Sequence, residues 1–550
     1  MFEDGEDAVL VKFIFVTGGV LSSVGKGIVT ASIGKILQVR GYRVSVIKID
    51  PYLNVDCGTM NPYQHGEIFV TEDGGEIDLD LGHYERFLDI NLTKDHNITT
   101  GQIYWEVIRR ERKGDYLGRC VQIVPHITDE IKRRIYMIAD REPIDVLLTE
   151  VGGTVGDIEG LPYLEAIRQI RLEKGYEHTM FVHVALVPIL DVTGEEKTKP
   201  LQHSVNELRR IGIQPDVIVA RCVRMIGKEA KAKIALFGTI PEEAVFCSYT
   251  LPCIYQAPLM LDEQGMGDYI VKRLGLAARK PDWTRWRRIV ESFLDAKYEV
   301  RVAMVGKYAA LADAYVSINE AIKHAAAYCN ARARIDWIEA EEFENPENLK
   351  RLSDYDGILI PPGFGARGTE GKIMAADYAR RMNIPLLGIC FGFQMSIVAF
   401  ARYVCGLKDA NSTENDPDTP NPVIDLMPEQ KNVKMLGGTM RLGAQPVRLI
   451  PGTLAHRLYG GKAVVMERHR HRWEVNPKYW SILQENGMVF SGFTLDGTRV
   501  EIFELPDRYF YMGTQFHPEF KSRPGKPSPP YYGFIKACLD RRLGKPRPEL

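Results

Sequence analysis

The sequence contains no apolar run near the roughly 20 residues that a membrane-spanning helix needs. Its first ten residues, MFEDGEDAVL, are acidic and lack the positive start and apolar stretch of a signal peptide. With a formal net charge of −2, the chain has no overall basic field that would draw it to nucleic acid or anionic membranes. These absences predict a cytoplasmic protein without membrane or nucleic-acid partners, in which local lysines bind any anionic ligand.

Cysteine is sparse and unpaired. The nine cysteines include no CxxC pair and form no regularly spaced framework, a pattern that fits a reducing compartment better than a secreted disulfide scaffold. The sequence also lacks fixed-period repeats and long low-complexity tracts. Two proline-containing segments, Asn411–Pro428 and Ser522–Pro530, are predicted to be loops.

A chain of 550 residues with 45% hydrophobic and 26% charged residues is predicted to be globular and to have more than one domain. The first part reads as a βαβ unit, with strands at Lys12–Thr17 and Val44–Ile49 joined by a helix that ends near Arg40. Later apolar runs alternate with helical patterns such as Pro162–Leu172; these runs are Ile144–Thr149, Met180–Val187 and Asp216–Ala220. This alternation predicts an α/β fold with a mainly parallel, P-loop-like Rossmann-type sheet.

A second α/β domain is predicted after a helical connector. Residues 280–299 contain two tryptophans and an Arg-rich amphipathic pattern without a strand signal. Beyond them the α/β pattern repeats, with a helix at Tyr315–Cys329 and strands at Val300–Val305, Gly357–Ile360 and Pro385–Ile389. The predicted organisation is therefore a first domain at 1–279, a linker helix at 280–299 and a second domain at 300–550.

A Gly-rich loop, Gly18–Gly27, lies between the first strand and its helix, where backbone N–H groups and the helix dipole can hold phosphate oxygens. Lys26 would reach the terminal phosphates. A strict P-loop has Ser or Thr after the lysine, but this chain has Gly27, so a magnesium ligand must come from elsewhere. Asp80 and Glu150 are candidates for that role, and solvated loop carboxylates are the alternative.

Other lysines could also meet phosphates. Lys48 ends the second strand beside the loop, where it is either a phosphate contact or an ordinary surface lysine. A separate basic cluster starts at Lys197 and is joined by Lys233. Taken alone it is more often a solvated charged face, but a second triphosphate ligand would give it a role.

The sharpest signal is Gly388-Ile389-Cys390-Phe391-Gly392, which follows a buried strand and opens a helix. Small residues two positions on either side of the cysteine are typical of a nucleophile elbow. Cys390 would stand at a helix N-terminus, where the helix dipole stabilises a thiolate. An inert buried cysteine is the alternative.

Partners for this cysteine occur in Gln515-Phe516-His517-Pro518-Glu519. The spacing lets His517 face the thiol while Glu519 holds the imidazole. The loop Pro361-Pro362-Gly363-Phe364-Gly365 follows a strand and can supply an N–H that stabilises an oxyanion. Together these segments predict an acyl-transfer site.

At these residues the second half resembles class I, triad-type glutamine amidotransferases, and nearly the whole chain resembles the CTP synthase family. The blocks that carry the resemblance include VTGGVLSSVGKG, KIDPYLNVDCGTM, QHGEIFVTEDGGEIDLDLGHYERF, GDYLGRCVQIVPHITDEIK, EVGGTVGDIEGLPYLEAIRQ, KTKPLQHSV, NSTEND, LGGTMRLGAQ and ERHRHRWEVNP. The family's activity is amination of UTP to CTP with ATP and glutamine-derived ammonia, in which ATP phosphorylates the uracil O4 before ammonia displaces phosphate at C4.

The resemblance implies a role for each site residue. ATP would bind at Ser23, Val24, Gly25, Lys26, Gly27, Ile28, Lys48, Asp80, Tyr249, Thr250 and Leu251. UTP, and CTP in competition, would bind at Ser22, Asp157, Ile158, Glu159, Lys197, Thr198, Lys199, Pro200, Leu201, Gln202 and Lys233. Glutamine would bind at Gly363, Phe391, Gly392, Phe393, Gln394, Glu414 and Arg472, around the catalytic residues Cys390, His517 and Glu519; Asp80 and Glu150 would bind Mg²⁺.

The resemblance also implies GTP as an allosteric activator and a homotetramer that could form filaments. Two positions depart from the family: Pro362 replaces a usual glycine, and Ser248-Tyr249-Thr250-Leu251 differs from the commoner pattern near the adenine. A cobyrinate amidase has the same two-part plan, but the KTKPLQ block argues against it. An assembly protein with a vestigial amidotransferase half is a further alternative, against which the intact Cys390, His517 and Glu519 argue.

Overall fold

The computed structural model describes residues 11–61, 65–190, 194–307, 312–363, 365–430 and 437–548. The chain forms two compact units. The first runs to Asp56 and resumes over His83–Val290, and the second comprises Cys57–Gly82 and Glu291–Leu550. The early segment Cys57–Gly82 thus packs with the C-terminal half. The predicted division at 280–299 takes no account of this segment and stays a prediction.

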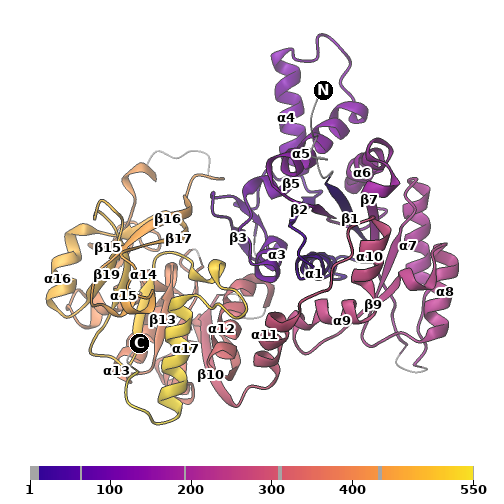
Figure 1. Cartoon of the computed structure of the whole chain (residues 1–550). Helices are drawn as coiled ribbons and strands as arrows, with labels where there is room; N and C mark the ends of the chain where they lie inside the picture. The colour runs from indigo at the N-terminus through magenta and orange to yellow at the C-terminus, as the bar shows by residue number, and fades with distance from the viewer. Residues whose placement is uncertain are drawn as a thin grey trace, which may run out of the picture. The chain divides into compact units, whose positions relative to one another are not determined.

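A parallel seven-stranded sheet forms the first unit, in the order β5-β2-β6-β1-β7-β8-β9 (Figure 1). Its strands are β1 (Lys12–Gly19), β2 (Val44–Asp50), β5 (Asn97–Thr99), β6 (Val146–Val151), β7 (Thr179–Leu186), β8 (Val217–Cys222) and β9 (Val245–Tyr249). The strands are buried along nearly their whole length because their apolar runs are covered on both faces. The predicted α/β fold with a parallel sheet is confirmed.

Helices pack around this sheet (Figure 1). They are α1 (Lys26–Gln38), α4 (Thr100–Lys113), α5 (Thr128–Arg141), α6 (Leu161–Lys174), α7 (Lys199–Arg210), α8 (Lys228–Gly238), α9 (Ala257–Glu263) and α10 (Met266–Arg273). The chain passes from one unit to the other within two further helices, α3 (Asp80–Leu88) and α11 (Thr284–Leu294). Helix α11 lies in the predicted connector, whose last residues, Tyr298 and Glu299, already begin a strand.

The main sheet of the second unit has nine strands in the order β11-β10-β12-β13-β21-β20-β19-β16-β17. Neighbours from β11 to β21 pair in parallel, and those from β21 to β17 pair antiparallel. The strands are β10 (Tyr298–Gly306), β11 (Ala331–Glu339), β12 (Gly357–Ile360), β13 (Leu386–Ile389), β16 (Arg441–Leu449), β17 (Val464–His471), β19 (Val489–Phe493), β20 (Val500–Glu504) and β21 (Tyr511–Thr514). The predicted strands all fall in the parallel part.

The remaining elements of the second unit include two small sheets. These contain β3 (Ile68–Val70) with β4 (Glu76–Asp78), and β14 (Ala410–Ser412), β15 (Asn421–Leu426) and β18 (Trp473–Val475). The helices are α12 (Val316–Tyr328), α13 (Thr369–Arg381), α14 (Phe391–Tyr403), α15 (Leu454–Leu458), α16 (Trp480–Glu485) and α17 (Pro529–Arg542).

One loop prediction is wrong. The segment Asn411–Pro428 contains most of β14 and all of β15, which pair with each other in parallel. The proline signal misled because Pro422 stands second in β15, near the start of the strand, where a missing N–H disturbs pairing least.

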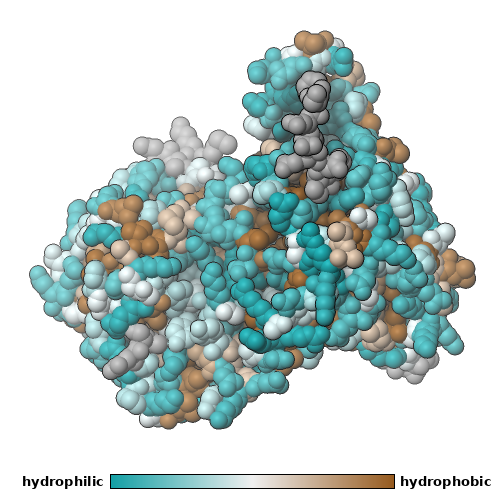
Figure 2. All heavy atoms as spheres, viewed as in Figure 1, coloured by the Kyte–Doolittle hydropathy of each residue, from teal (hydrophilic) through white to brown (hydrophobic). Residues whose placement is uncertain are grey.

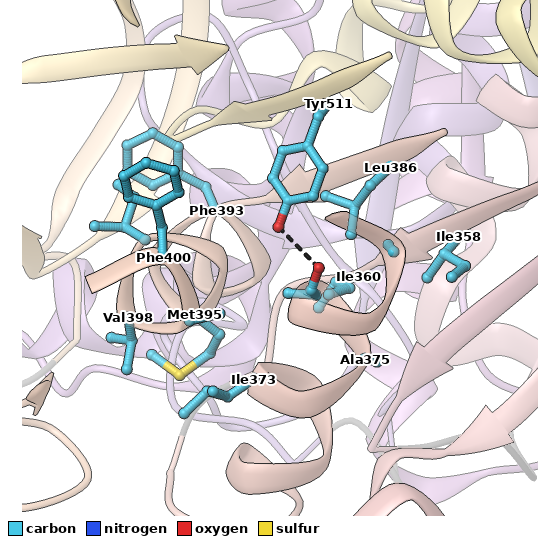
Figure 3. Close-up of a cluster of buried hydrophobic side chains, with 14 of the residues drawn as sticks. Ile358, Ile360, Ile373, Ala375, Leu386, Phe393, Met395, Val398, Phe400 and Tyr511 are labelled. Atoms are coloured by element: carbon cyan, nitrogen blue, oxygen red, sulfur yellow. Dashed lines mark hydrogen bonds between the residues drawn. The ribbon is translucent and has the colours of Figure 1, made fainter. Parts of the chain in front are cut away.

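The core of the second unit packs α13 and α14 against the main sheet (Figure 3). Side chains of α14 pack against Ile373 and Ala375 of α13 and against three strand residues. The α14 residues labelled in Figure 3 are Phe393, Met395, Val398 and Phe400, and the strand residues are Ile358, Ile360 and Leu386. The buried Tyr511 hydroxyl donates a hydrogen bond to the Ala376 carbonyl at 3.1 Å, so its polar atom is not left without a partner. This packing fixes α13 beside α14, whose N-terminus carries Cys390.

On the face shown in Figure 2, hydrophobic residues are scattered among polar ones. None of the helices within the described ranges is long and apolar enough to cross a membrane. All nine cysteines are free thiols.

Candidate active sites

Cys390 occupies a strained turn between β13 and α14. Its φ of 50° and ψ of −102° are rare for a residue with a side chain. A Cβ on Gly392 would stand 1.9 Å from the Ile360 carbonyl oxygen, and one on Gly388 would stand 2.8 Å from the Gly392 carbonyl oxygen. Only glycines fit these two positions, so the spacing that predicted a nucleophile elbow has a direct steric cause.

His517 and Glu519 form a buried pair beside this turn. Nδ1 of His517 lies 2.7 Å from Oε1 of Glu519, and the Tyr531 hydroxyl donates to the other Glu519 oxygen at 3.5 Å. Burial lowers the pKa of His517, but Glu519 and then Cys390 outweigh this effect and raise that pKa to about 10. The imidazole of His517 therefore favours its protonated form.

One cavity of about 300 Å³ brings the predicted catalytic residues together. Cys390, His517 and Glu519 all line it. Other residues on its wall include Pro362, Gly363 and Phe391 from the predicted oxyanion region, and Gly58, Glu67, Tyr315 and Arg470. Within the described residues, Nε2 of His517 makes no hydrogen bond, which leaves this nitrogen available for proton transfer with a substrate.

The loop after β12 is fastened from several sides. Lys372 donates to the Pro361 carbonyl at 3.0 Å, and the Gly365 N–H donates to Oε1 of Glu414 at 2.8 Å. Lys307 donates to the Gly365 carbonyl. Gly363 has a φ of 150°, which favours glycine at this point. Phe364 lies outside the described residues.

In the first unit, the Gly-rich loop connects β1 to α1 with an irregular backbone. Val20, Ser23 and Gly25 all have positive φ, at 77°, 58° and 94°. Lys26 is the first residue of α1 and is 7% exposed, and its ammonium donates to the Gly153 carbonyl at 2.9 Å. This places a lysine and a helix N-terminus in one loop, as phosphate binding requires.

Arg221 links this loop to the predicted adenine segment. Its Cδ lies 3.8 Å from the position of a Cβ on Gly25, and its guanidinium donates to Oγ1 of Thr250 at 3.2 Å and to the Ser248 carbonyl at 3.2 Å. Thr250 therefore lies on the same side of the sheet as the loop. Arg221 was not predicted as a site residue from the sequence. The one feature that could have indicated it is a cation at the carboxyl end of an apolar strand.

Glu150 is the second-last residue of β6 and is fully buried. Lys48 on β2 forms an ion pair with Oε1 of Glu150 at 2.7 Å, and the Tyr84 hydroxyl donates to Oε2. Asp80, the other predicted magnesium ligand, belongs to the second unit, and its backbone N–H donates to Oδ1 of Asp78 at 2.8 Å. The joint role of Asp80 and Glu150 stays a prediction.

The chemistry of Glu150 fits a magnesium ion that arrives with a nucleotide. Magnesium takes oxygen ligands and commonly needs only one or two carboxylates when phosphates supply the rest. Within the described ranges, no three His, Cys, Asp or Glu side chains converge as in a metal site made by protein alone. Glu150 would then exchange its ion pair with Lys48 for the metal.

The basic cluster surrounds the start of α7. Lys197 forms an ion pair with Glu195 at 2.6 Å. Lys197, and to a smaller extent Lys233, lower the pKa of the Glu195 carboxyl, so both lysines lie near Glu195. Thr198 is the N-cap residue of α7 and accepts a bond from the Gln202 side chain at 2.9 Å. Lys199 and Lys233 are exposed, whereas Leu201 is buried and contributes to packing.

The other predicted UTP residues lie on exposed turns. Ser22 is exposed in the Gly-rich loop. Asp157 precedes a short turn formed by Ile158 and Glu159, and its carboxylate accepts the Thr154 N–H at 2.7 Å. Ile158 is 80% exposed.

Known protein families match both halves of the chain. The model described as CTP synthase N-terminus matches residues 12–276, and the one described as glutamine amidotransferase class-I matches residues 310–537. The CTP synthase of Thermococcus gammatolerans is 58% identical over 97% of this chain and 100% of its own length. That of Carboxydothermus hydrogenoformans is 56% identical over 96% of this chain and 99% of its own length. The chain belongs to the CTP synthase family.

Among solved structures, the glutaminase domain of Trypanosoma brucei CTPS with bound acivicin is 38% identical to this member of the CTP synthase family. It covers 44% of this chain and 94% of that domain, with a TM-score of 0.42.

Only some of the residues that the family resemblance implies for glutamine binding line the cavity that contains Cys390. Gly363 and Phe391 line it. Gln394 instead donates to the Trp473 carbonyl at 2.9 Å, and Arg472 binds Gln430 and the Thr439 hydroxyl. Gly392 and Phe393 are buried in α14, and Glu414 holds the oxyanion loop. These roles stay predictions.

Arg470, two residues before Arg472, does line the cavity. Its guanidinium forms an ion pair with Glu76 at 2.8 Å and donates to the Gly58 carbonyl at 3.2 Å. Arg470 belongs to β17, whereas Arg472 lies beyond the end of the strand, so the side-chain period of two that would put both on one face does not extend to Arg472. The ERHRHRW block contains three arginines and two histidines, and the sequence alone does not say which of them faces the thiol.

Proposed function

We propose that this chain converts UTP to CTP with ATP and glutamine as co-substrates, as a ligase of pyrimidine biosynthesis. The observation that carries the proposal is the convergence of Cys390, His517 and Glu519 on one cavity, in a chain that matches CTP synthases over 97% of its length at 58% identity. Ammonia supplied directly should replace glutamine.

In the amidotransferase unit, the Cys390 thiolate attacks the side-chain amide carbon of glutamine. His517, protonated beside Glu519, gives its proton to the departing ammonia and leaves a glutamyl thioester on Cys390. Water then attacks the thioester, with His517 as general base, and releases glutamate. The N–H groups of Gly363 and Phe391 are the proposed donors to the oxyanion in both steps.

In the synthase unit, Lys26 and the Gly-rich loop hold the ATP phosphates, and Tyr249, Thr250 and Leu251 lie toward the adenine. The γ-phosphoryl group passes to the uracil O4, which converts a poor leaving group into phosphate. Ammonia then attacks C4 and phosphate departs. Lys197 and Lys233 would offset the charge of the UTP triphosphate.

Two further features accompany this proposal. Mg²⁺ held by Asp80 and Glu150 would offset charge on the transferring phosphoryl group. Ammonia released at Cys390 should reach the uracil by a sheltered path, because protonation in water removes its nucleophilicity. GTP activation, a homotetrameric assembly and filament formation are part of the same proposal by family membership.

A spectrophotometric assay of CTP formation tests the proposal. The full-length enzyme is incubated with UTP, ATP and Mg²⁺, and with glutamine or ammonium chloride as nitrogen source. We expect CTP with either source and none without ATP. Glutamine hydrolysis without any CTP from either source would reject the proposed function and favour another amidotransferase.

A further inference from the structure

Lys372 is a fully buried lysine that the proposed mechanism does not use. It lies on α13 and has an exposed fraction of 0%. Its neighbours Ile373 and Ala375 belong to the core cluster that packs α13 against α14 (Figure 3). Burying an ammonium without a matching partner costs several kcal/mol, so this position needs an explanation.

The amine of Lys372 lies directly behind the proposed oxyanion donors. It donates to the Pro361 carbonyl at 3.0 Å, its one hydrogen bond among the described residues. It lies 5.0 Å from the centroid of the Phe391 ring and 3.6 Å from the position of a Cβ on Gly363. Lys372 does not line the cavity. The amine therefore lies beside the residues proposed to donate to the oxyanion.

A second cation shares this position. Nζ of Lys307, at the end of β10, also lies 5.0 Å from the Phe391 ring centroid, and Lys307 donates to the Gly365 carbonyl. Two amines thus fasten the same loop, at Pro361 and at Gly365. Gly363, the proposed oxyanion donor, lies between these two fastened positions.

The charges around Lys372 and Cys390 are of both signs. Facing them from the packed elements are Lys307 on the loop after β10, Arg367 before α13, Glu414 after β14, Arg470 on β17, and His517 with Glu519 after β21. Burial lowers the pKa of Lys372 well below its ordinary value and Lys307 lowers it further, whereas Cys390 and Glu414 raise it. Burial therefore favours the neutral amine of Lys372, which still donates its hydrogen bond to Pro361.

We propose that Lys372 is a positioning residue of the amidotransferase site, which holds the oxyanion loop through its hydrogen bond to the Pro361 carbonyl. This inference rests on the proposed function, because it assumes that Cys390 is the nucleophile. It adds a buried hydrogen-bond donor on α13 to a site that otherwise relies on backbone N–H groups and His517.

The test compares the full-length enzyme with Lys372→Met, Lys372→Gln and Lys372→Arg. Lys323→Met, at a half-exposed lysine of α12, is the matched control. Three quantities are measured: ammonia-dependent CTP formation, kcat and KM for glutamine hydrolysis, and the rate at which iodoacetamide alkylates Cys390 across pH. Mass spectrometry of the Cys390 peptide separates this thiol from the other eight cysteines.

We expect Lys372→Met to keep ammonia-dependent activity within about threefold and to lose about tenfold or more in kcat for glutamine at pH 7, with little change in KM, because the loop donors are displaced from the oxyanion. Lys372→Gln and Lys372→Arg keep a donor for Pro361 and should restore most of kcat. Alkylation of Cys390 should match the wild type in all three variants, and Lys323→Met should match the wild type in every measurement.

A kcat for glutamine equal to wild type in Lys372→Met would overturn the proposal, because the loop would then keep its position without the Lys372 donor. An equal loss of kcat in the Met, Gln and Arg variants would overturn it too, because a donor for Pro361 would then make no difference. Loss of ammonia-dependent activity in both the Met and Gln variants would also overturn it, since Lys372 would then serve the fold alone. If the wild type itself hydrolyses no glutamine, the proposed function fails, and this outcome is distinct from a failure confined to the variants.

Discussion

At the scale of single residues, Cys390 shows how backbone strain serves the site. A positive φ in a residue with a side chain costs roughly 1–3 kcal/mol, and the structure retains it because the strand, the helix and two glycines fix the turn. The backbone N–H of Cys390 donates to the Thr514 carbonyl at 2.8 Å, next to the strand end that leads to His517. One turn therefore sets both the exposure of the thiol and its distance from the base.

The loop glycine and its preceding proline give the first prediction. Pro362→Gly should leave glutamine hydrolysis within about threefold, because a proline has no N–H and so was never an oxyanion donor. Gly363→Pro should reduce kcat by about 10² to 10³, since it deletes a donor and cannot adopt the φ of 150° found there. Ammonia-dependent CTP formation should persist in both variants.

Steady-state glutaminase assays check this pair of variants. If Pro362→Gly instead raised glutamine turnover by orders of magnitude, the amidotransferase unit of this chain would be impaired by its own proline.

Lys26 gives the second prediction. Lys26→Met should abolish CTP formation with glutamine and with ammonia, because phosphoryl transfer precedes amination and a cation on the terminal phosphates typically contributes several kcal/mol to the transition state. Glutamine hydrolysis without ATP should be unchanged. The exposed Lys94→Met is a control for loss of a lysine. An ammonia-dependent rate within a few-fold of wild type would remove Lys26 from the phosphate site.

Residue chemistry was the most predictable level of the site. The glycine spacing around Cys390 and the His517-x-Glu519 spacing each have a steric or electrostatic meaning that a sequence displays directly. Arg221, Arg470 and Lys372 were not predictable as site residues, because their roles depend on which way a strand or helix turns its side chains. A lone lysine or arginine in an amphipathic pattern carries no such information.

At the scale of elements, β17 is unusual in burying charge. Glu467, Arg468 and His469 follow one another on it and are all less than 9% exposed. The Tyr459 hydroxyl donates to Oε1 of Glu467 at 2.8 Å. Burial raises the pKa of Glu467 from 4.5 to about 7, even though Lys521, Tyr459 and Arg468 act in the opposite direction. The carboxyl therefore favours its neutral form in the folded protein.

This shift gives the third prediction. Because the folded pKa of Glu467 exceeds its unfolded value, the native state binds more protons between pH 4.5 and about 7, and its stability falls as pH rises through that window. The loss approaches about 3 kcal/mol at most, at 1.36 kcal/mol per unit of pKa. Glu467→Gln cannot titrate, so its melting temperature relative to wild type should rise by several degrees from pH 5 to pH 8.

Differential scanning fluorimetry across pH measures this difference. Glu485→Gln, at an exposed residue of α16, should follow the wild type at every pH. A constant difference between Glu467→Gln and wild type would show that Glu467 does not titrate in this range.

The elements were predictable where each strand is an unbroken apolar run. The strands at the centres of both parallel sheets follow that rule, because helices cover both faces. The strands in the antiparallel part of the second sheet were not predictable from an apolar run. Strand β17 has the sequence Val464-Val465-Met466-Glu467-Arg468-His469-Arg470-His471, and a segment this polar resembles a loop. Buried ion pairs, such as that between Arg441 and Glu501 at 2.6 Å, replace the apolar pattern there.

At the scale of the whole molecule, the proposed function assigns two reactions to two units, which have separate cores. The cluster around α14 belongs to the second unit, and the cluster around β1 and β7 belongs to the first. Division of the sequence near the middle was predictable from the repeated α/β pattern. The assignment of Cys57–Gly82 to the second unit was not, because its contacts, such as that between Ser317 and Glu67 at 3.0 Å, join residues about 250 positions apart.

The central claim is that one unit makes ammonia and the other uses it, and the Cys390→Ala variant tests it most directly. CTP formation is measured with glutamine and with ammonium chloride, beside the wild type, after a melting curve has shown that the variant is folded. The account predicts that the glutamine-dependent rate disappears, because no thioester can form, while the ammonia-dependent rate stays within about twofold of wild type. Loss of both rates in a folded variant, or survival of the glutamine-dependent rate, would contradict the account.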